Sequence, residues 1–520
     1  MSVPAGLSPV PPLAPPPRLA SLKLNNFRAF PEPEIFSLEG KNLLVYGENG
    51  SGKSSIFAAL RALFRHPSPP PTLNSKHAFE NKFKQPQGGP WSVEAVFTNG
   101  KTVTWANTGL QGDKSLRNEI ALKAAMLDYR ALMETNHLHG EDRVNLFEVI
   151  VNNLLASYGI TGPGIYPFPT SGTAQVAISE YWGKLTTIRE SIGNKSNAIP
   201  PRILQACQGF NAGVNAALNA VNGLLPVLLR DLKYQDMQVK PLTFSGLIPN
   251  ASHWLSARQY GGQEIWLEVG YRGEALQHPH LFLNEARLSA LGLAIYLAGR
   301  LALVQQATGE APKLLVLDDV LIGIDHSNRL PVLDVLNKYF ADWQVVLLTH
   351  DRTWFDLARA HLPKQEWIYY EVYEGDPSAA APMPIAYKVE SELPRALLNK
   401  GTSLMPDYCE AAANYTRQAF ELGMRIACEV IPIEMPFKQS SKNHKSQELL
   451  GKLANWKVKG RLDKQGVTQK DWDSILHRLQ MFKDIVMNPY SHPSAPNIPK
   501  QEIADAIAAV TAFLDLVAKK

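Results

Sequence analysis

The stretch "LLVYGENGSGKSSIFAAL", Leu43 to Leu60, decides the fold class of this chain. It fits the pattern G-x-x-x-x-G-K-[ST], with Gly47, Gly52, Lys53 and Ser54 at the fixed positions. In such a loop the glycines let backbone N–H groups surround phosphate oxygens, the lysine reaches the outer phosphates and the hydroxyl holds Mg²⁺. An apolar run precedes the loop and a helical pattern follows it. The sequence therefore predicts a phosphate-binding loop between a strand and a helix.

The composition is that of a soluble globular protein. Of 520 residues, 45% are hydrophobic and 19% charged, and the net charge of +4 does not by itself indicate a nucleic-acid partner. The longest apolar stretch, Leu288 to Val304, contains Arg300 and is shorter than a bilayer span, which predicts a buried helix. Three scattered cysteines form no metal-binding pattern, and no signal-peptide pattern opens the chain. We expect a cytoplasmic protein with no membrane partner.

The N-terminal part of the chain predicts three segments. Residues 1–18 are rich in proline and predict an extended tail. Residues 19–115 contain "SLKLNNFRAF" and "WSVEAVFTNGKTVTWA", whose alternation and Asn-Gly turn predict antiparallel strands flanking the loop. Residues 116–250 carry apolar residues at helical spacing without a sustained heptad, so a compact helical insertion is expected.

Strand patterns return over residues 251–395. The runs "KLLVLDDV" and "WQVVLLTHD" suit buried parallel strands, and "EWIYYEVYEG" with "PIAYKVE" predicts a last hairpin. Residues 396–520 are helical in pattern and predict a separate domain.

Carboxylates downstream of the loop predict the second half of an ATP site. Asp318 and Asp319 end an apolar run, the Walker B arrangement. The first carboxylate is expected to complete Mg²⁺ coordination through Ser54 or water, and the second to orient the attacking water. Asp325 stands six residues after Asp319, and another apolar run ends at His350. We interpret His350 as a sensor of the terminal phosphate.

The order of "NNFRAF", "GENGSGKSS", "LNEARLSALGLAIYLA", "LDDVLIGID" and "LLTHD" resembles the ABC-type ATPase heads of the RecF and SMC-like family, over about residues 20–395 without the insertion. The resemblance implies an α/β head with a mixed sheet, flanking antiparallel strands, a helical insertion and a helical C-terminal domain. It further implies that two heads hold two Mg·ATP molecules between them. The signature sequence of one head would then contact the nucleotide on the other.

The resemblance also assigns roles to individual residues. Asp319 and His350 would be catalytic, and Ser54 and Asp318 would hold the metal ion. The nucleotide would be bound by Arg28, Gly47, Asn49, Gly50, Ser51, Gly52, Lys53, Ser54, Ser55, the signature Asn284 and the D-loop Asp325.

The sequence departs from the family pattern in three places. The signature resembles L-S-x-G-[EQ] in the family, but here Leu283–Arg287 reads "LNEAR". Asn284 keeps a short polar side chain that contacts phosphate or caps the helix, whereas Ala286 adds a methyl group where glycine allows close approach. Asp319 replaces the usual glutamate, so we expect slow hydrolysis or a requirement for partner-induced closure. No Q-loop glutamine is found, and Tyr129 lies near its position.

The C-terminal segment has two features of its own. Between Lys438 and Lys470, nine Lys or Arg residues accompany two acidic ones, a pattern of a nucleic-acid surface or of a solvated face. The helices that follow resemble the C-terminal half of HEPN-type domains, some of which are RNases with an R-x(4 to 6)-H motif. His492 is present, but positions 485–487 are Ile, Val and Met, and Arg478 is too distant for the motif. A non-catalytic interaction module is expected.

Three functional hypotheses follow from this reading. The first is an ATPase that dimerises around Mg·ATP and regulates a separate nuclease or other effector, as in Septu-type antiphage defence. The second is a RecF-like DNA repair or recombination ATPase that binds DNA directly. The third is an ATP-controlled HEPN-type RNase toxin.

Overall fold

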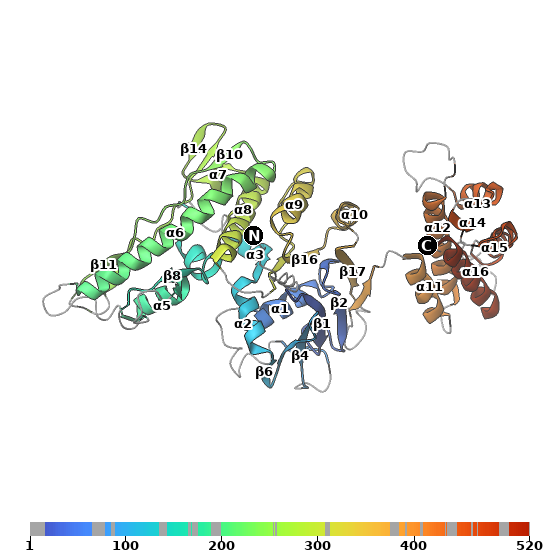
Figure 1. Cartoon of the computed structure of the whole chain (residues 1–520), viewed down its shortest axis with the longest axis horizontal. Helices are drawn as coiled ribbons and strands as arrows, with labels where there is room; N and C mark the ends of the chain where they lie inside the picture. Colours follow the sequence, from blue (N-terminus) through green and yellow to red (C-terminus); the bar gives the residue numbers. More distant parts are fainter. Residues whose placement is uncertain are drawn as a thin grey trace, which may run out of the picture. The chain divides into compact units, whose positions relative to one another are not determined.

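The computed structural model divides the chain into two compact units, Met1–Lys388 and Val389–Lys520 (Figure 1). The boundaries predicted within the first unit, after residues 18, 115 and 250, stay predictions. The structure describes residues 16–64, 79–84, 89–134, 143–164, 168, 175–188, 199–252, 254, 257–306, 312–363, 365–374, 384–389, 393–405, 409–431, 433, 445–458, 461–464, 466–487 and 499–518.

A six-stranded sheet of order β18-β17-β3-β16-β15-β7 forms the centre of the first unit. Five strands are parallel and β18 is antiparallel to β17, so the predicted buried parallel strands and the last hairpin are confirmed. Because parallel strands end at the same edge, the loops after β3, β15 and β16 meet there. The bounds are β3 Asn42–Gly47, β7 Ala125–Asp128, β15 Leu314–Asp318, β16 Gln344–Thr349, β17 Trp367–Tyr373 and β18 Ile385–Lys388.

A second, antiparallel sheet of order β2-β1-β4-β5-β6 accompanies the central one. Helix α1, Lys53–Phe64, contacts strands of both sheets, and its Ile56, Leu60 and Leu63 are buried in their shared core. This layered arrangement confirms the predicted α/β fold with a mixed sheet and flanking antiparallel strands. The bounds are β1 Leu19–Asn25, β2 Glu34–Ser37, β4 Ser92–Phe97, β5 Thr102–Ala106 and β6 Gly109–Gly112.

The segment between α1 and the signature region is less helical than its sequence pattern predicts. Residues 125–128 form β7, which pairs with β15 in the central sheet, although we expected a helix there. The apolar spacing of so short a run fits either state, and pairing with β15 decides for the strand. The elements are α2 Lys114–Lys123, α3 Tyr129–Glu134, α4 Phe147–Val149, η2 Ile150–Leu154, β8 Gly159–Thr161, β9 Gln175–Ala177, α5 Ile178–Ile188, α6 Pro201–Asp231, β10 Met237–Val239, β11 Ile248–Asn250, β12 Gln259–Gly261, β13 Val269–Tyr271 and β14 Glu274–Leu276.

Helix α6 packs against α8, Glu285–Gln306, which follows the short α7, Pro279–Phe282 (Figure 1). Both helices are long and apolar enough to cross a membrane by composition alone. In α8, 78% of the most apolar stretch is buried inside the unit. Packing in the protein core therefore explains why this helix is apolar. This confirms the prediction of a buried helix over Leu288 to Val304.

Three asparagines on α6 bind the backbone of residues 242–247, which run extended along the helix. Asn215 donates to the carbonyl of Phe244 at 2.9 Å and accepts from its N–H at 3.1 Å. These side chains supply hydrogen bonds that a neighbouring strand would otherwise give. The pairs are Asn211 with Leu247, Asn215 with Phe244, and Asn222 with Leu242.

We expect Asn215→Ala to lower the free energy of unfolding by roughly 1–3 kcal/mol, because it leaves the N–H and carbonyl of a buried residue without partners. Denaturant unfolding followed by circular dichroism measures the change. Asn219→Ala is the matched control, since Asn219 is exposed on the same helix. Equal midpoints for the two variants would contradict a role for these bonds.

Every described secondary-structure element of the second unit is a helix, as the sequence predicts. Its core gathers residues from most of these helices, among them Phe420, Trp472 and Phe513. Thr468 and Asp471 form a capping box that begins α15. The helices are α11 Leu393–Leu404, α12 Cys409–Val430, α13 Ser446–Asn455, α14 Arg461–Lys464, α15 Gln469–Phe482, η6 Lys483–Met487 and α16 Lys500–Ala518. Residues 1–15 of the predicted proline-rich tail, Lys438 and His492 lie outside the described residues.

Candidate nucleotide-binding site

The loop between β3 and α1 has a backbone that only glycine permits at several positions. Gly50 and Gly52 have φ angles of 89° and 105°, in the left-handed region. A Cβ on Gly47 would lie 2.4 Å from the Ser51 hydroxyl and 2.6 Å from the carbonyl of Val372. The tight loop leads directly into the N-terminus of α1, the arrangement that receives phosphate. The residues present therefore fit a nucleotide phosphate chain.

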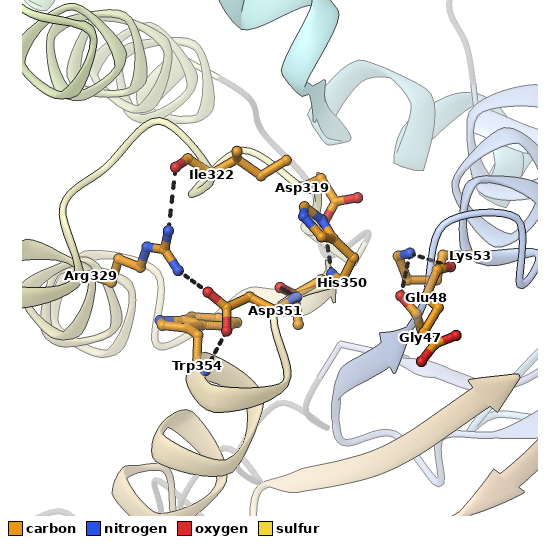
Figure 2. Close-up of polar contacts among 10 residues, drawn as sticks. Gly47, Glu48, Lys53, Asp319, Ile322, Arg329, His350, Asp351 and Trp354 are labelled. Carbon is orange, nitrogen blue, oxygen red and sulfur yellow. Dashed lines mark hydrogen bonds and ion pairs between the residues drawn. The ribbon is translucent and has the colours of Figure 1, made fainter.

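Lys53 lies folded over this loop. Its ammonium group donates to the carbonyls of Gly47 at 2.5 Å and Glu48 at 3.1 Å (Figure 2). Burial lowers the pKa of Lys53, while the charges of Asp319 and Asp318 act in the opposite direction. A lysine held this way has a positive charge that water does not fully screen, and phosphate oxygens are its natural partners.

The remaining predicted loop residues differ in exposure. Asn49 and Ser54 are exposed, whereas Ser51 and Ser55 are buried. The Ser55 hydroxyl accepts from the N–H of Ala29 at 3.3 Å, which attaches the "NNFRAF" segment to α1. Arg28 belongs to that segment, and its guanidinium donates to the carbonyl of Ser54 at 3.4 Å. The structure thus brings Arg28 to the first turn of the helix that the loop begins.

Asp318 is a buried carboxylate at the end of β15, with 6% of its surface exposed. Burial, followed by the charge of Asp319, raises the pKa of Asp318 to about 6, while a hydrogen bond with Ser54 lowers it. Its Oδ1 atom has no hydrogen-bond partner among the described residues. A buried carboxylate oxygen beside a hydroxyl is a donor set that suits Mg²⁺. When bound, Mg²⁺ would neutralise phosphate charge, with Ser54 and Asp318 holding it.

The raised pKa of Asp318 predicts that Mg·ATP binding weakens in acid. The folded protein keeps a proton on Asp318 up to about pH 6, whereas the ordinary pKa of the carboxyl is 3.8. Protonation of Asp318 therefore stabilises the fold at low pH, and this contribution is lost as the pH rises from 3.8 to about 6. Mg²⁺ requires the ionised form, so we expect its affinity to fall about fivefold from pH 6 to pH 5. Titrations of Mg²⁺ in the presence of ATP measure this.

Asp318→Asn is the control for that titration, because it keeps the titration of the nucleotide and removes that of the carboxyl. The difference between the two profiles isolates Asp318. Parallel profiles for the wild type and the variant would contradict the assignment of Asp318 as a metal ligand.

Asp319 and His350 are brought together by neighbouring strands. Asp319 has a φ of 55°, which turns the chain sharply after β15. One carboxylate oxygen, Oδ1, accepts from the His350 backbone N–H at 2.9 Å and lies 3.0 Å from its Nδ1 (Figure 2). If His350 donates from Nδ1, the histidine fixes the orientation of the carboxylate that we predict to be the general base. The sequence placed both residues at strand ends but did not predict their contact.

Asn284 and Asp325 each accept a hydrogen bond from a residue three positions further along the chain. Asn284 caps α8, accepting from the N–H of Arg287 at 3.1 Å. Asp325 precedes α9, His326–Tyr339, and its carbonyl accepts from Asn328. Among the described residues, no hydrogen bond joins either of them to the loop that begins at Gly47.

Sequence reasoning missed two features of the site. Asp128 ends β7 and pairs in register with Asp318, so a third carboxylate lies beside the two predicted ones. The run "AMLD" repeats the apolar-then-acidic pattern of "LLVLD" and was the signal available. Next to it, the Tyr129 hydroxyl donates to Glu285 at 2.9 Å and connects the predicted Q-loop position to the signature helix.

The strand order, the α1 helix between two sheets and the loop at its N-terminus define the first unit as an α/β domain with a mixed sheet, flanking antiparallel strands and a P-loop. The family model of the AAA domain matches residues 21–151, which include β3, the loop and α1. A comparison with curated proteins finds no match.

Solved structures similar to this chain have low sequence identity. The recombination mediator protein RecF–ATP of the RecFOR pathway is 13% identical, with a TM-score of 0.44 over 72% of this chain and 98% of that one. An Smc head domain bound to the C-terminal domain of ScpA, derived from Pyrococcus furiosus, is 11% identical, with a TM-score of 0.41 over 74% and 99%. The SMC head domain from Thermotoga maritima is 16% identical, with a TM-score of 0.32 over 72% and 100%.

Proposed function

We propose that this chain binds and hydrolyses Mg·ATP at the site formed by the P-loop, Asp318, Asp319 and His350. The observation that carries the proposal is the buried, unpartnered Oδ1 of Asp318, beside a loop that only glycines permit. An ion and a nucleotide would compensate both the buried carboxylate and the buried lysine. Equilibrium binding of ATP with and without Mg²⁺, followed by phosphate release, tests the proposal.

We further propose that two copies of the chain close around two nucleotides. Asn284 and Asp325 have no described bond to the P-loop of their own chain, so both are available to a nucleotide held by a second copy. The side chains of Leu281 and Phe282, just before the signature, are 62% and 65% exposed and offer apolar surface to that copy. Light scattering with and without Mg·ATP measures the change in molar mass.

The closed dimer is proposed to regulate a separate nuclease or other effector in bacterial antiphage defence. The support is the resemblance to compact Septu-type ATPases, together with a helical unit over residues 389–520 that has its own core. In this proposal the second unit, which resembles HEPN domains, serves as the interaction module. Affinity purification of the ATP-bound chain from its host, followed by mass spectrometry, tests for the effector. Recovery of the chain without a nuclease would count against it.

A RecF-like ATPase that binds DNA directly is the second candidate, and one observation favours it. Lys445, Lys452, Lys457 and Lys470 are all exposed on or beside α13 and α15. Phosphate contacts by these side chains would make DNA binding strongly dependent on salt. DNA-stimulated ATP turnover that is lost in the double variant Lys452→Gln/Lys457→Gln would establish this function over the first. The RNase hypothesis concerns His492, which lies outside the described residues.

A further inference from the structure

The loop between β15 and α9 is the element through which a second copy would reach the catalytic residues. We call residues Val320–Asp325 the D-loop. It begins directly after Asp319, whose carbonyl accepts from the N–H of Ile322 at 3.4 Å. The Ile322 side chain is 40% exposed, so the D-loop presents apolar surface to solvent.

The inner side of the D-loop packs against the signature helix. A Cβ on Gly323 would lie 2.2 Å from the hydroxyl of Ser289 and 3.5 Å from the side chain of Glu285, both on α8. The D-loop is therefore in close contact with the first turns of that helix. If the signature region moves, the D-loop must move with it, because packed interiors are not continuously deformable.

Arg329, in the second turn of α9, folds back and holds the D-loop (Figure 2). Its Nε donates to the carbonyl of Ile324 at 2.8 Å and its Nη2 to the carbonyl of Ile322 at 3.3 Å. Its Nη1 donates to a carboxylate oxygen of Asp351 at 2.6 Å. The side chain of Arg329 is only 9% exposed, so water does not replace these bonds easily.

Asp351 follows His350 in the chain, and hydrogen bonds to residues other than Arg329 also hold it in place. Its second carboxylate oxygen accepts from the N–H of Trp354 at 3.0 Å and caps α10, Arg352–His361. Its own N–H donates to the hydroxyl of Thr349 at 3.1 Å. One planar guanidinium thus joins the D-loop to the loop that carries His350, because its three nitrogen atoms donate to acceptors in both loops.

A small cavity of about 40 Å³ lies between these two loops, lined by Asp319, Arg329, His350, Asp351 and Trp354 among others. It leaves room for the loops to shift relative to each other. Arg329 is the described side chain that bonds to both loops across it. Any shift of the D-loop will therefore pull on Asp351 and on the neighbouring histidine.

We propose that Arg329 is a positioning residue that couples the D-loop to His350 and Asp319. When a second copy docks on the D-loop and displaces it, Arg329 passes this displacement to His350 and to the Asp319 carboxylate, which acts on the attacking water. The inference rests on the proposed function. It adds to that function the residue through which dimer closure regulates hydrolysis. Arg329 does not touch the nucleotide in this proposal, so nucleotide affinity is independent of it.

Arg329→Gln and Asp351→Asn test the coupling, with Lys338→Gln as the matched control. Asparagine still caps α10, so Asp351→Asn removes mainly the charge that faces Arg329. Lys338 pairs with Asp231 from the far end of the same helix and does not touch the D-loop. Steady-state ATP hydrolysis gives kcat and KM, and hydrogen exchange without nucleotide reports on the amides of Ile322 and Ile324.

We expect both variants to lower kcat about 10- to 100-fold, because a displaced catalytic group loses its orientation. KM should change less than about threefold, and exchange at the D-loop amides should be faster. The double variant should be no slower than the worse single one, since the two residues act as a unit. Lys338→Gln should match the wild type in every measurement.

Three results would overturn the inference. An unchanged kcat in Arg329→Gln excludes the coupling, whether or not exchange is faster. A parallel loss of ATP affinity and melting temperature assigns Arg329 a structural role only. Additive losses in the double variant show that Arg329 and Asp351 act separately. Absence of hydrolysis by the wild-type chain would instead refute the proposed function itself, and the two failures are thereby distinguished.

Discussion

Lys53→Ala is expected to weaken ATP binding by at least about 100-fold, to a level where no hydrolysis is measurable. The ammonium group is buried over the loop and its pKa is lowered by burial, so it is a poorly hydrated cation close to where phosphate would bind. Alanine removes that charge and leaves the carbonyl oxygens of Gly47 and Glu48 without their donor. Fluorescence titration with an ATP analogue measures the affinity.

Lys114→Ala is the control for Lys53→Ala, because Lys114 is exposed at the first turn of α2. It should bind ATP as the wild type does. Circular dichroism and thermal unfolding establish that both variants fold. Wild-type affinity in a folded Lys53→Ala protein would rule out this loop as the nucleotide site.

Asp319→Asn is expected to bind ATP normally while hydrolysis falls by roughly 10²- to 10³-fold. Asparagine tolerates the positive φ of position 319, and its amide oxygen still accepts from the His350 N–H, so the local geometry is kept. What it cannot do is take a proton from water. Asp319→Ala is a harsher test, since alanine at a φ of 55° adds backbone strain.

With hydrolysis blocked, ATP should hold two copies of Asp319→Asn together, and the molar mass in Mg·ATP should double. Light scattering after gel filtration in ATP measures the mass. Asp342→Asn, an exposed aspartate paired with Lys313, is the control and should hydrolyse ATP at the wild-type rate. If Asp319→Asn turns over normally, another group is the base. If it binds ATP but stays monomeric, the dimer proposal is wrong.

The fold of the first unit could be predicted largely from the sequence, because its main signals are local. The apolar runs of β15 and β16 are long and β-branched or leucine-rich, and buried parallel strands require such runs. The four residues of β7 repeat the apolar-then-acidic pattern of β15, but the run is short and lies within a segment of helical spacing. Their helical spacing was overruled by pairing with β15, a contact between segments far apart in the chain.

The candidate site was predicted as a set of residues, and its connections were not. Spacing in the sequence located the glycine-rich loop, both carboxylates and His350, since each follows or precedes a recognisable strand. The Asp128 carboxylate beside Asp318 and the Asp319–His350 contact depend on which strands are neighbours in the sheet. No local pattern specifies that order.

What the sequence alone determined is the chemistry: a loop of glycines with one lysine, and carboxylates at strand ends. What only the tertiary structure decided is which of these groups is buried, unpartnered or joined to another. Arg329 shows the difference, for in the sequence it is one charged residue on a helix, whereas in the fold it bonds to two loops at once. The physical reason is that burial and long-range pairing set the energies of polar groups, and both arise only when distant segments pack together.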